Sequence, residues 1–110
     1  RIGALGEFVL KLPETAIDMP FNETLRIIAK NHVDPMHHSR AIIQSPGYSP
    51  SQAATMGMLD EAVAADQVQD NALAKLTELC KLPSARYEEN KLFIRAEEIQ
   101  EIYESLHGDN

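Results

Sequence analysis

The sequence predicts a helix-rich α+β fold, on three observations. Segments with apolar residues at helical spacing occupy most of the chain after residue 22. Strand-like residues are confined to the start, where Phe8 to Leu10 precede Pro13, and to an extended segment at residues 58–63. Caps and prolines separate these segments. We therefore expect a core of short strands and helices over residues 1–65 and a helical region over residues 66–110.

Three helices are predicted in the first region, each beginning at a capping side chain. The caps are Asn22, Asp34 (followed by Pro35) and Ser49 (with Gln52 completing a capping box), for helices over 23–33, 35–44 and 50–56. Gly57 is a good stop for the third helix. One or two strands before Pro13 leave open edges, so we expect further sheet from missing chain or from another subunit.

The second region reads as two amphipathic helices. Asp66, with Gln69 three residues later, is the expected start of the first helix, which ends at Pro83. The last helix covers about residues 84–106, and residues 108–110 should fray. The apolar stripes are Val68, Ala72, Leu76, Leu79 and Cys80 in the first helix, and Leu92, Ala96, Ile99, Ile102, Tyr103 and Leu106 in the second.

Charge and composition exclude several kinds of function. The chain has 110 residues, with 17 Asp and Glu against 10 Lys and Arg, for a net charge of −7. Nucleic-acid binding needs basic stretches that neutralise phosphates, so we expect no such partner. No apolar run approaches the roughly 18 residues that span a bilayer, so we expect no membrane partner either. Cys80 is the only cysteine, which fits a reducing compartment, with the cytoplasm as the default, and we expect it in the core.

Three histidines suggest a metal site, but their placement argues against one. His37 and His38 are adjacent and point about 100° apart on a helix, and Pro35 separates them from His32. A zinc site needs three or four converging ligands. We therefore predict no metal and surface positions for these histidines.

Three stretches, in order and in register, resemble the crotonase (enoyl-CoA hydratase/isomerase) superfamily. Residues 1–8 running into Leu12-Pro13-Glu14-Thr-Ala-Ile17 are similar to a strand followed by a Pro-Glu-hydrophobic-x-hydrophobic-Gly turn. Residues 48–63 resemble the Ser-Ala-Glu-Glu-Ala…Gly-Leu-Val-Asp-x-Val passage, and residues 87–95 resemble the Thr-Lys-x-x-x-Arg start of the terminal helix. The resemblance implies the carboxy-terminal part of the family's fold, a remnant of its ββα spiral followed by its terminal helices.

The resemblance also implies site residues. Glu14 matches the second catalytic glutamate of the hydratases, and Asp18 stands where the family has glycine. Lys91 and Arg95 match positions that approach coenzyme A; the alternative is a solvated face on which they pair with Glu88 or Glu98. The implied substrate is a coenzyme A thioester, and no covalently bound cofactor is expected. The first glutamate and both oxyanion-hole amides of the family belong upstream of the segment that matches Arg1.

Two functional hypotheses follow from the resemblance. In the first, the chain is a truncated crotonase-like protein that is non-catalytic and self-associates as a homo-oligomer through its carboxy-terminal helices and strand edges. In the second, it is the carboxy-terminal segment of an enoyl-CoA hydratase/isomerase. That segment would act on acyl-CoA thioesters once the amino-terminal half is supplied, with Glu14 as acid/base.

Overall fold

The structure, a computed structural model, describes residues 1–108, so residues 109 and 110 of the predicted frayed end lie outside the described part. The elements in chain order are β1 (Ile2–Ala4), η1 (Thr15–Ile17), α1 (Glu23–His32), η2 (Pro35–His37), α2 (His38–Gln44), α3 (Pro50–Thr55), β2 (Glu61–Val63), η3 (Ala65–Gln67), α4 (Val68–Leu79) and α5 (Ser84–His107). The predicted helix-rich α+β class is confirmed. The division into regions 1–65 and 66–110 stays a prediction.

The two strands form a short parallel pair. Ile2, Gly3 and Ala4 stand opposite Glu61, Ala62 and Val63. A parallel pair needs a long crossover, and here the crossover includes α1, α2 and α3. Neither outer edge of this pair has a strand beside it among residues 1–108. A two-stranded sheet is marginal alone, so the pair depends on what packs around it.

The buried core lies entirely between residues 27 and 56. One cluster combines Val33, Ala41, Tyr48 and Met56, and Leu12 packs against it. The other buried apolar residues are Ile27, Ala29 and Ala53. Neither α4 nor α5 contains a buried residue.

The predicted starts of α1 and α3 are confirmed, because in each case the capping side chain accepts a hydrogen bond from a backbone N–H group of the first turn. The Asn22 side chain accepts a hydrogen bond from Leu25 N at 2.8 Å, and both bonds of the Ser49–Gln52 capping box are present. Gly57 has a φ of +87°, and a Cβ there would lie 2.7 Å from the His32 carbonyl oxygen. This close approach requires glycine.

Three sequence predictions are wrong. Asp66 lies inside the 3₁₀ turn η3, and the helix that follows has Gln67 at its N-cap without a side-chain bond. Cys80 is exposed and not in the core, because nothing described covers that face of α4. His32 and His38 are partly buried rather than on the surface, since each ring nitrogen Nε2 has a partner inside the fold.

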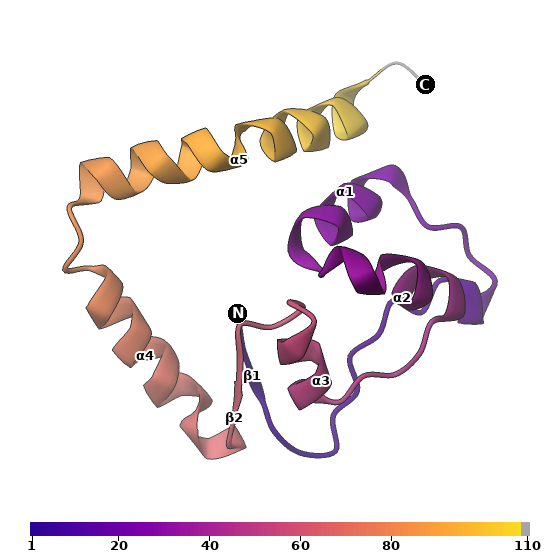
Figure 1. The fold of residues 1–110 in the computed structure, drawn as a ribbon, viewed down its shortest axis with the longest axis horizontal. Coiled ribbons are helices and arrows are strands. Elements are labelled where there is room, and N and C mark those ends of the chain that lie inside the picture. The colour runs from indigo at the N-terminus through magenta and orange to yellow at the C-terminus, as the bar shows by residue number, and fades with distance from the viewer. Residues whose placement is uncertain (109–110) are drawn as a thin grey trace.

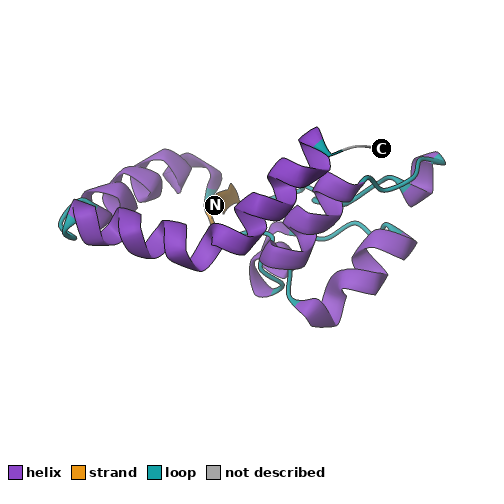
Figure 2. Ribbon diagram, turned by 90° about the horizontal axis from the view of Figure 1, so that it is seen from above, coloured by secondary structure: helices purple, strands orange, loops and turns teal. Residues whose placement is uncertain are grey.

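Helix α5 lies along α1 through polar contacts (Figures 1 and 2). Three pairs run antiparallel along the two helices: Thr24 with Ser105 at 2.7 Å, Lys30 with Glu101 at 3.3 Å, and His32 with Glu98 at 2.7 Å. Helix α4 contacts β1, and a sharp turn at residues 80–83 joins it to α5. The two long helices therefore form an open bracket beside the core (Figure 1).

The described chain is more open than a compact domain of its size. Its radius of gyration is 16.3 Å, whereas about 13 Å is typical of 110 residues. Within residues 1–108, no helix has both the length and the apolar content to cross a membrane.

Candidate functional site

Glu14 lies at the start of a turn that directly follows the apolar residue Leu12 and Pro13. Leu12 packs on the core, and Pro13 leads directly into the turn of η1. The Glu14 carbonyl accepts a hydrogen bond from Met19 N at 2.8 Å, and Thr15 Oγ1 donates to the Ile42 carbonyl at 2.9 Å. One hydrogen bond therefore closes the turn, and another joins the turn to α2.

The Glu14 side chain is half-buried, and its Oε2 atom is buried without a hydrogen-bond partner. An ionised carboxylate only accepts hydrogen bonds, and a buried acceptor without a donor is destabilising. A carboxyl group can act as a general acid or base only where it lies within hydrogen-bond reach of a substrate. The assignment of Glu14 as catalytic stays a prediction.

Asp18 closes the same turn from the other end. Its φ and ψ of 60° and 42° place it in the left-handed region, and its N–H donates to the Thr15 carbonyl. Glycine adopts this conformation without strain, which explains why a glycine suits the position in the family pattern. The Asp18 side chain is exposed, whereas the Oε2 atom of Glu14 is buried.

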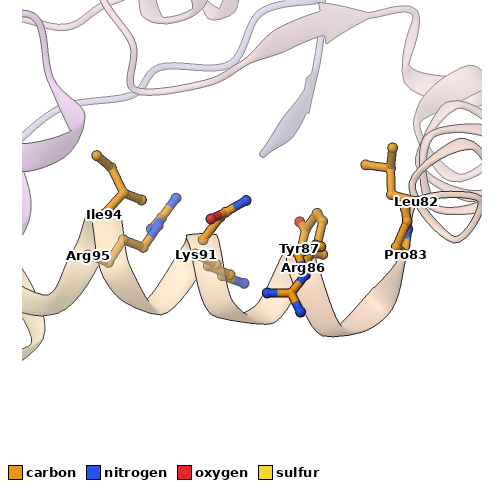
Figure 3. A pocket seen from close by; sticks show the side chains of 8 residues that line it. Leu82, Pro83, Arg86, Tyr87, Lys91, Ile94 and Arg95 are labelled. Atoms are coloured by element: carbon orange, nitrogen blue, oxygen red, sulfur yellow. The ribbon is translucent and has the colours of Figure 1, made fainter.

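Lys91 and Arg95 line one pocket at the start of α5, with a volume of about 490 Å³ (Figure 3). All of its lining residues come from α5 and the turn before it. The other six are Leu82, Pro83, Arg86, Tyr87, Asn90 and Ile94. The pocket is a surface hollow with three cationic side chains and one aromatic ring, a set that suits phosphate groups and a flat base.

The predicted alternative, a solvated face with ion pairs, is met only in part: Lys91 and Arg95 are exposed to solvent, but neither pairs with Glu88 or Glu98. Glu98 pairs with His32, and within residues 1–108 no carboxylate forms an ion pair with Lys91 or Arg95. Lys91 Nζ lies 6.0 Å from the centre of the Tyr87 ring, at the limit of a cation–π contact.

Arg86 is the pocket residue that sequence reasoning missed. It forms an ion pair with Glu89 on the exposed side of α5. The segment that resembles the family begins at residue 87, one residue after Arg86. The spacing of 86, 90 and 94 defines a row of residues beside the row of 87, 91 and 95, and this pattern could have found it.

The described residues do not bring the two parts of the predicted site together. Glu14 belongs to the turn before η1, whereas Lys91 and Arg95 belong to α5, and Glu14 does not line their pocket. Among residues 1–108, no group of three or more His, Cys, Asp or Glu side chains could hold a metal ion.

Solved structures share this fold closely. An enoyl-CoA hydratase/isomerase family protein from Pseudomonas syringae superposes with a TM-score of 0.90 and 25% identity, over 97% of this chain and 49% of that one. An enoyl-CoA hydratase from Mycobacterium marinum gives 0.90 and 22%, over 98% and 48%. The human mitochondrial delta3-delta2-enoyl-CoA isomerase gives 0.81 and 20%, over 94% and 40%. No protein-family model and no curated protein matches the sequence.

The class is therefore a crotonase-type fold, and the predicted resemblance is confirmed at the level of structure. More particularly, the chain spans about half the length of the enoyl-CoA hydratase/isomerase structures that it matches, consistent with their carboxy-terminal part.

Proposed function

We propose that this chain is the assembly-forming, carboxy-terminal part of a crotonase-type protein and that it does not turn over acyl-CoA thioesters by itself. The observation that carries the proposal is the uncovered apolar surface of α4 and α5. Neither helix has a buried residue, yet both carry large apolar side chains that are half exposed or more. Those side chains include Leu73, Leu76, Leu92, Phe93, Ile94, Tyr103 and Leu106.

The size of the exposed surface supports association. The chain exposes 8156 Å², whereas a compact monomer of this mass exposes roughly 6,100 Å². The excess of about 2,000 Å² in one chain is larger than the roughly 800 Å² that each partner contributes to a standard interface. Copies of the same chain are the proposed partners, through α4, α5 and the open edges of the β1–β2 pair.

The proposed lack of independent catalysis follows from what the chemistry needs. Activating a thioester requires preorganised donors for the developing oxyanion, and that electrostatic contribution usually dominates. The resemblance assigns those donors, and the first of the family's two catalytic glutamates, to sequence upstream of the segment that matches Arg1. Glu14 by itself supplies one carboxylate and no such donors.

Sedimentation velocity over a range of protein concentrations tests the proposal. We expect an oligomer that Phe93→Glu weakens strongly, because Phe93 is 81% exposed on α5. Met36→Glu is the matched control, since Met36 is 87% exposed on η2, away from the proposed surface. A monomer at all concentrations that hydrates crotonyl-CoA, with activity lost in Glu14→Gln, would contradict the proposal.

A second candidate function is favoured by the pocket of Lys91 and Arg95. Joined to an amino-terminal half, the chain would bind an acyl-CoA thioester, with these cations on its phosphates and Glu14 as acid/base. Calorimetric titration with coenzyme A tests the binding step. Lys91→Gln and Arg95→Gln should each weaken binding about tenfold, a loss of about 1.4 kcal/mol, while Lys11→Gln should not. Equal affinities in all three variants would exclude this site.

The compartment is also part of the proposal. Cys80 is the only cysteine of the chain and is exposed as a free thiol. An exposed thiol persists in a reducing environment, so we propose the cytoplasm.

A further inference from the structure

One histidine ring joins three parts of the fold. His32 is the last residue of α1, and its two ring nitrogens have different partners. Nδ1 lies 3.2 Å from a guanidinium nitrogen of Arg1, and Nε2 lies 2.7 Å from Oε1 of Glu98 on α5. The side chains of His32 and Glu98 are largely buried. The ring therefore links the start of the chain, α1 and α5.

The two contacts fix the protonation state of the ring. A guanidinium group has five N–H donors and no acceptor, so Arg1 can only donate to Nδ1. Nδ1 must then carry a lone pair, and the proton of the neutral imidazole is on Nε2. From there it is donated to the Glu98 carboxylate. His32 is therefore neutral, in its Nε2–H form, when both bonds are present.

A second proton on the ring would change one contact and keep the other. Protonation replaces the lone pair of Nδ1 by an N–H group, so two donors of like charge would face each other across 3.2 Å. The bond from Arg1 would be lost. The contact with Glu98 would remain and become an ion pair, because an imidazolium cation donates to a carboxylate. Histidine is the side chain that ordinarily changes its charge between about pH 5 and 8.

Arg1 also holds the segment that leads into β2. Its Nε and Nη2 atoms donate to the carbonyls of Met58 and Gly57, both at 2.9 Å. Its own carbonyl accepts hydrogen bonds from the N–H groups of Asp60 and Glu61, at 2.8 and 3.3 Å. The bond from Arg1 to the imidazole thus ties α1 to the end of the β1–β2 pair at which both strands begin.

We propose that His32 is a pH-sensitive switch between two arrangements of this hydrogen-bond network. In the neutral arrangement the ring joins Arg1 and Glu98, so the strand pair, α1 and α5 are linked. In the protonated arrangement the ring keeps Glu98 and releases Arg1, so α5 stays docked while the end of the strand pair is loosened. This inference goes beyond the proposed function and depends on neither self-association nor coenzyme A binding.

Other charged groups face the same junction. Asp60 belongs to the segment before β2, and its carboxylate pairs with the amino group of Arg1. That hydrogen bond lowers the pKa of the Asp60 carboxyl, so Asp60 stays ionised where histidine titrates. Lys30 on α1 and Glu101 on α5 pair with each other at 3.3 Å. The amino group of Arg1 can also change its charge, so a variant must separate its effect from that of His32.

Nitrogen NMR of the unmodified chain tests the first step. At about pH 8, where histidine is ordinarily neutral, the ring of His32 should carry its proton on Nε2 and a lone pair on Nδ1. The opposite tautomer would overturn the inference, because a protonated Nδ1 could not accept a bond from Arg1. This measurement needs no variant and therefore does not depend on how the variants fold.

Hydrogen exchange tests the second step. The amides of Asp60 and Glu61 donate to Arg1. Their protection, corrected for the intrinsic effect of pH, should fall roughly threefold or more between about pH 8 and about pH 5, as expected when one hydrogen bond is lost. The amides of α5 should keep their protection, because the contact with Glu98 remains. In His32→Gln, which cannot change its charge, the fall should disappear, although the amino group of Arg1 is still present.

His107→Gln is the matched control, because His107 is an exposed histidine at the end of α5. It should keep the fall in protection at Asp60 and Glu61. Protection there that does not change with pH, or that falls equally in His32→Gln, would contradict the inference. Loss of protection in α5 at low pH would contradict it too, since protonation would then break the contact with α5 and not the contact with Arg1.

Discussion

At the residue scale, Asp18 stands where the resembling family motif has glycine, and its backbone is in the left-handed conformation that glycine adopts most easily. The position needs a left-handed conformation, because the N–H of Asp18 must turn back to the Thr15 carbonyl. Residues with a Cβ adopt this conformation at a cost of about 1–2 kcal/mol, with aspartate and asparagine among the better tolerated. The turn therefore forms with aspartate in place of glycine, and the backbone at Asp18 is strained.

Asp18→Gly should therefore raise the free energy of unfolding by about 1 kcal/mol, because glycine removes this backbone strain. Urea denaturation followed by circular dichroism measures the change. Asp18→Ala is the paired variant: it removes the same carboxylate but keeps a Cβ, and it should destabilise the protein. If both variants stabilised the protein equally, the charge of Asp18 and not its backbone would be the cause.

Glu23 gives a prediction about pH. The side-chain hydrogen bonds from Arg26 hold the pKa of the Glu23 carboxyl below its usual value. The ionised form is thus favoured in the folded state. Its contribution to stability is present above the pKa of the unfolded carboxyl and is lost as the pH falls through the folded pKa. In Arg26→Met, an NMR titration of the Glu23 side-chain carbon should show the pKa rising toward its ordinary value; an unchanged titration would exclude Arg26 as the cause.

At the element scale, local signals predicted helix starts well and burial poorly. Asn22 and Ser49 cap their helices as expected, because a capping bond spans only three residues and needs nothing from the rest of the fold. The apolar stripe of α5 has the spacing of a helix face that packs on a core, yet Leu92 and Ile99 are about half exposed. Whether a stripe is buried depends on distant chain, which no local pattern contains.

The candidate site shows the same limit. The motif around Pro13 predicts a turn at Glu14, and the structure has a turn there. Its orphaned oxygen was not predictable, because it depends on the packing of residues 42–48 against residues 10–15. Sequence reasoning likewise placed His32 on the surface, since its partner Glu98 is far away along the chain.

The docking of α5 depends on polar pairs, and His32–Glu98 is more buried than the other ion pair between α1 and α5, Lys30–Glu101. The side chains of His32 and Glu98 are 22% and 12% exposed, and their nitrogen and oxygen are 2.7 Å apart. Removing a hydrogen bond to a charged group costs about 1.5–3 kcal/mol. Glu98→Ala should therefore make the α5 amides exchange with deuterium at least roughly tenfold faster, since local opening sets that rate.

Glu97→Ala is the control for this experiment, because Glu97 is the exposed neighbour of Glu98 on the same helix. It should leave the exchange rates of α5 nearly unchanged. If Glu97→Ala accelerated exchange as much as Glu98→Ala, the pair with His32 would not be what holds α5 against α1.

At the scale of the whole molecule, the distribution of buried residues decides how the chain gains stability. All buried apolar residues lie between residues 27 and 56, and α4 and α5 add none. Hydrophobic burial is the dominant favourable contribution to folding, so a chain with so small a core has little stability as a separate unit. Association that covers α4 and α5 would add burial only in the assembled state.

This coupling predicts that the melting temperature depends on protein concentration. Because the folded assembly dissociates on unfolding, dilution favours the unfolded chain by mass action. For a chain of this length that forms a dimer, a tenfold increase in concentration should raise the melting temperature by about 3 °C. Differential scanning calorimetry of the unmodified chain and of Phe93→Glu measures the effect. The variant should melt at a lower temperature with little dependence on concentration, because Phe93 lies on the proposed contact surface.

A melting temperature that is high and constant over a hundredfold dilution would mean that the core of residues 27–56 is sufficient, and that the exposed faces of α4 and α5 need no partner for the chain to fold.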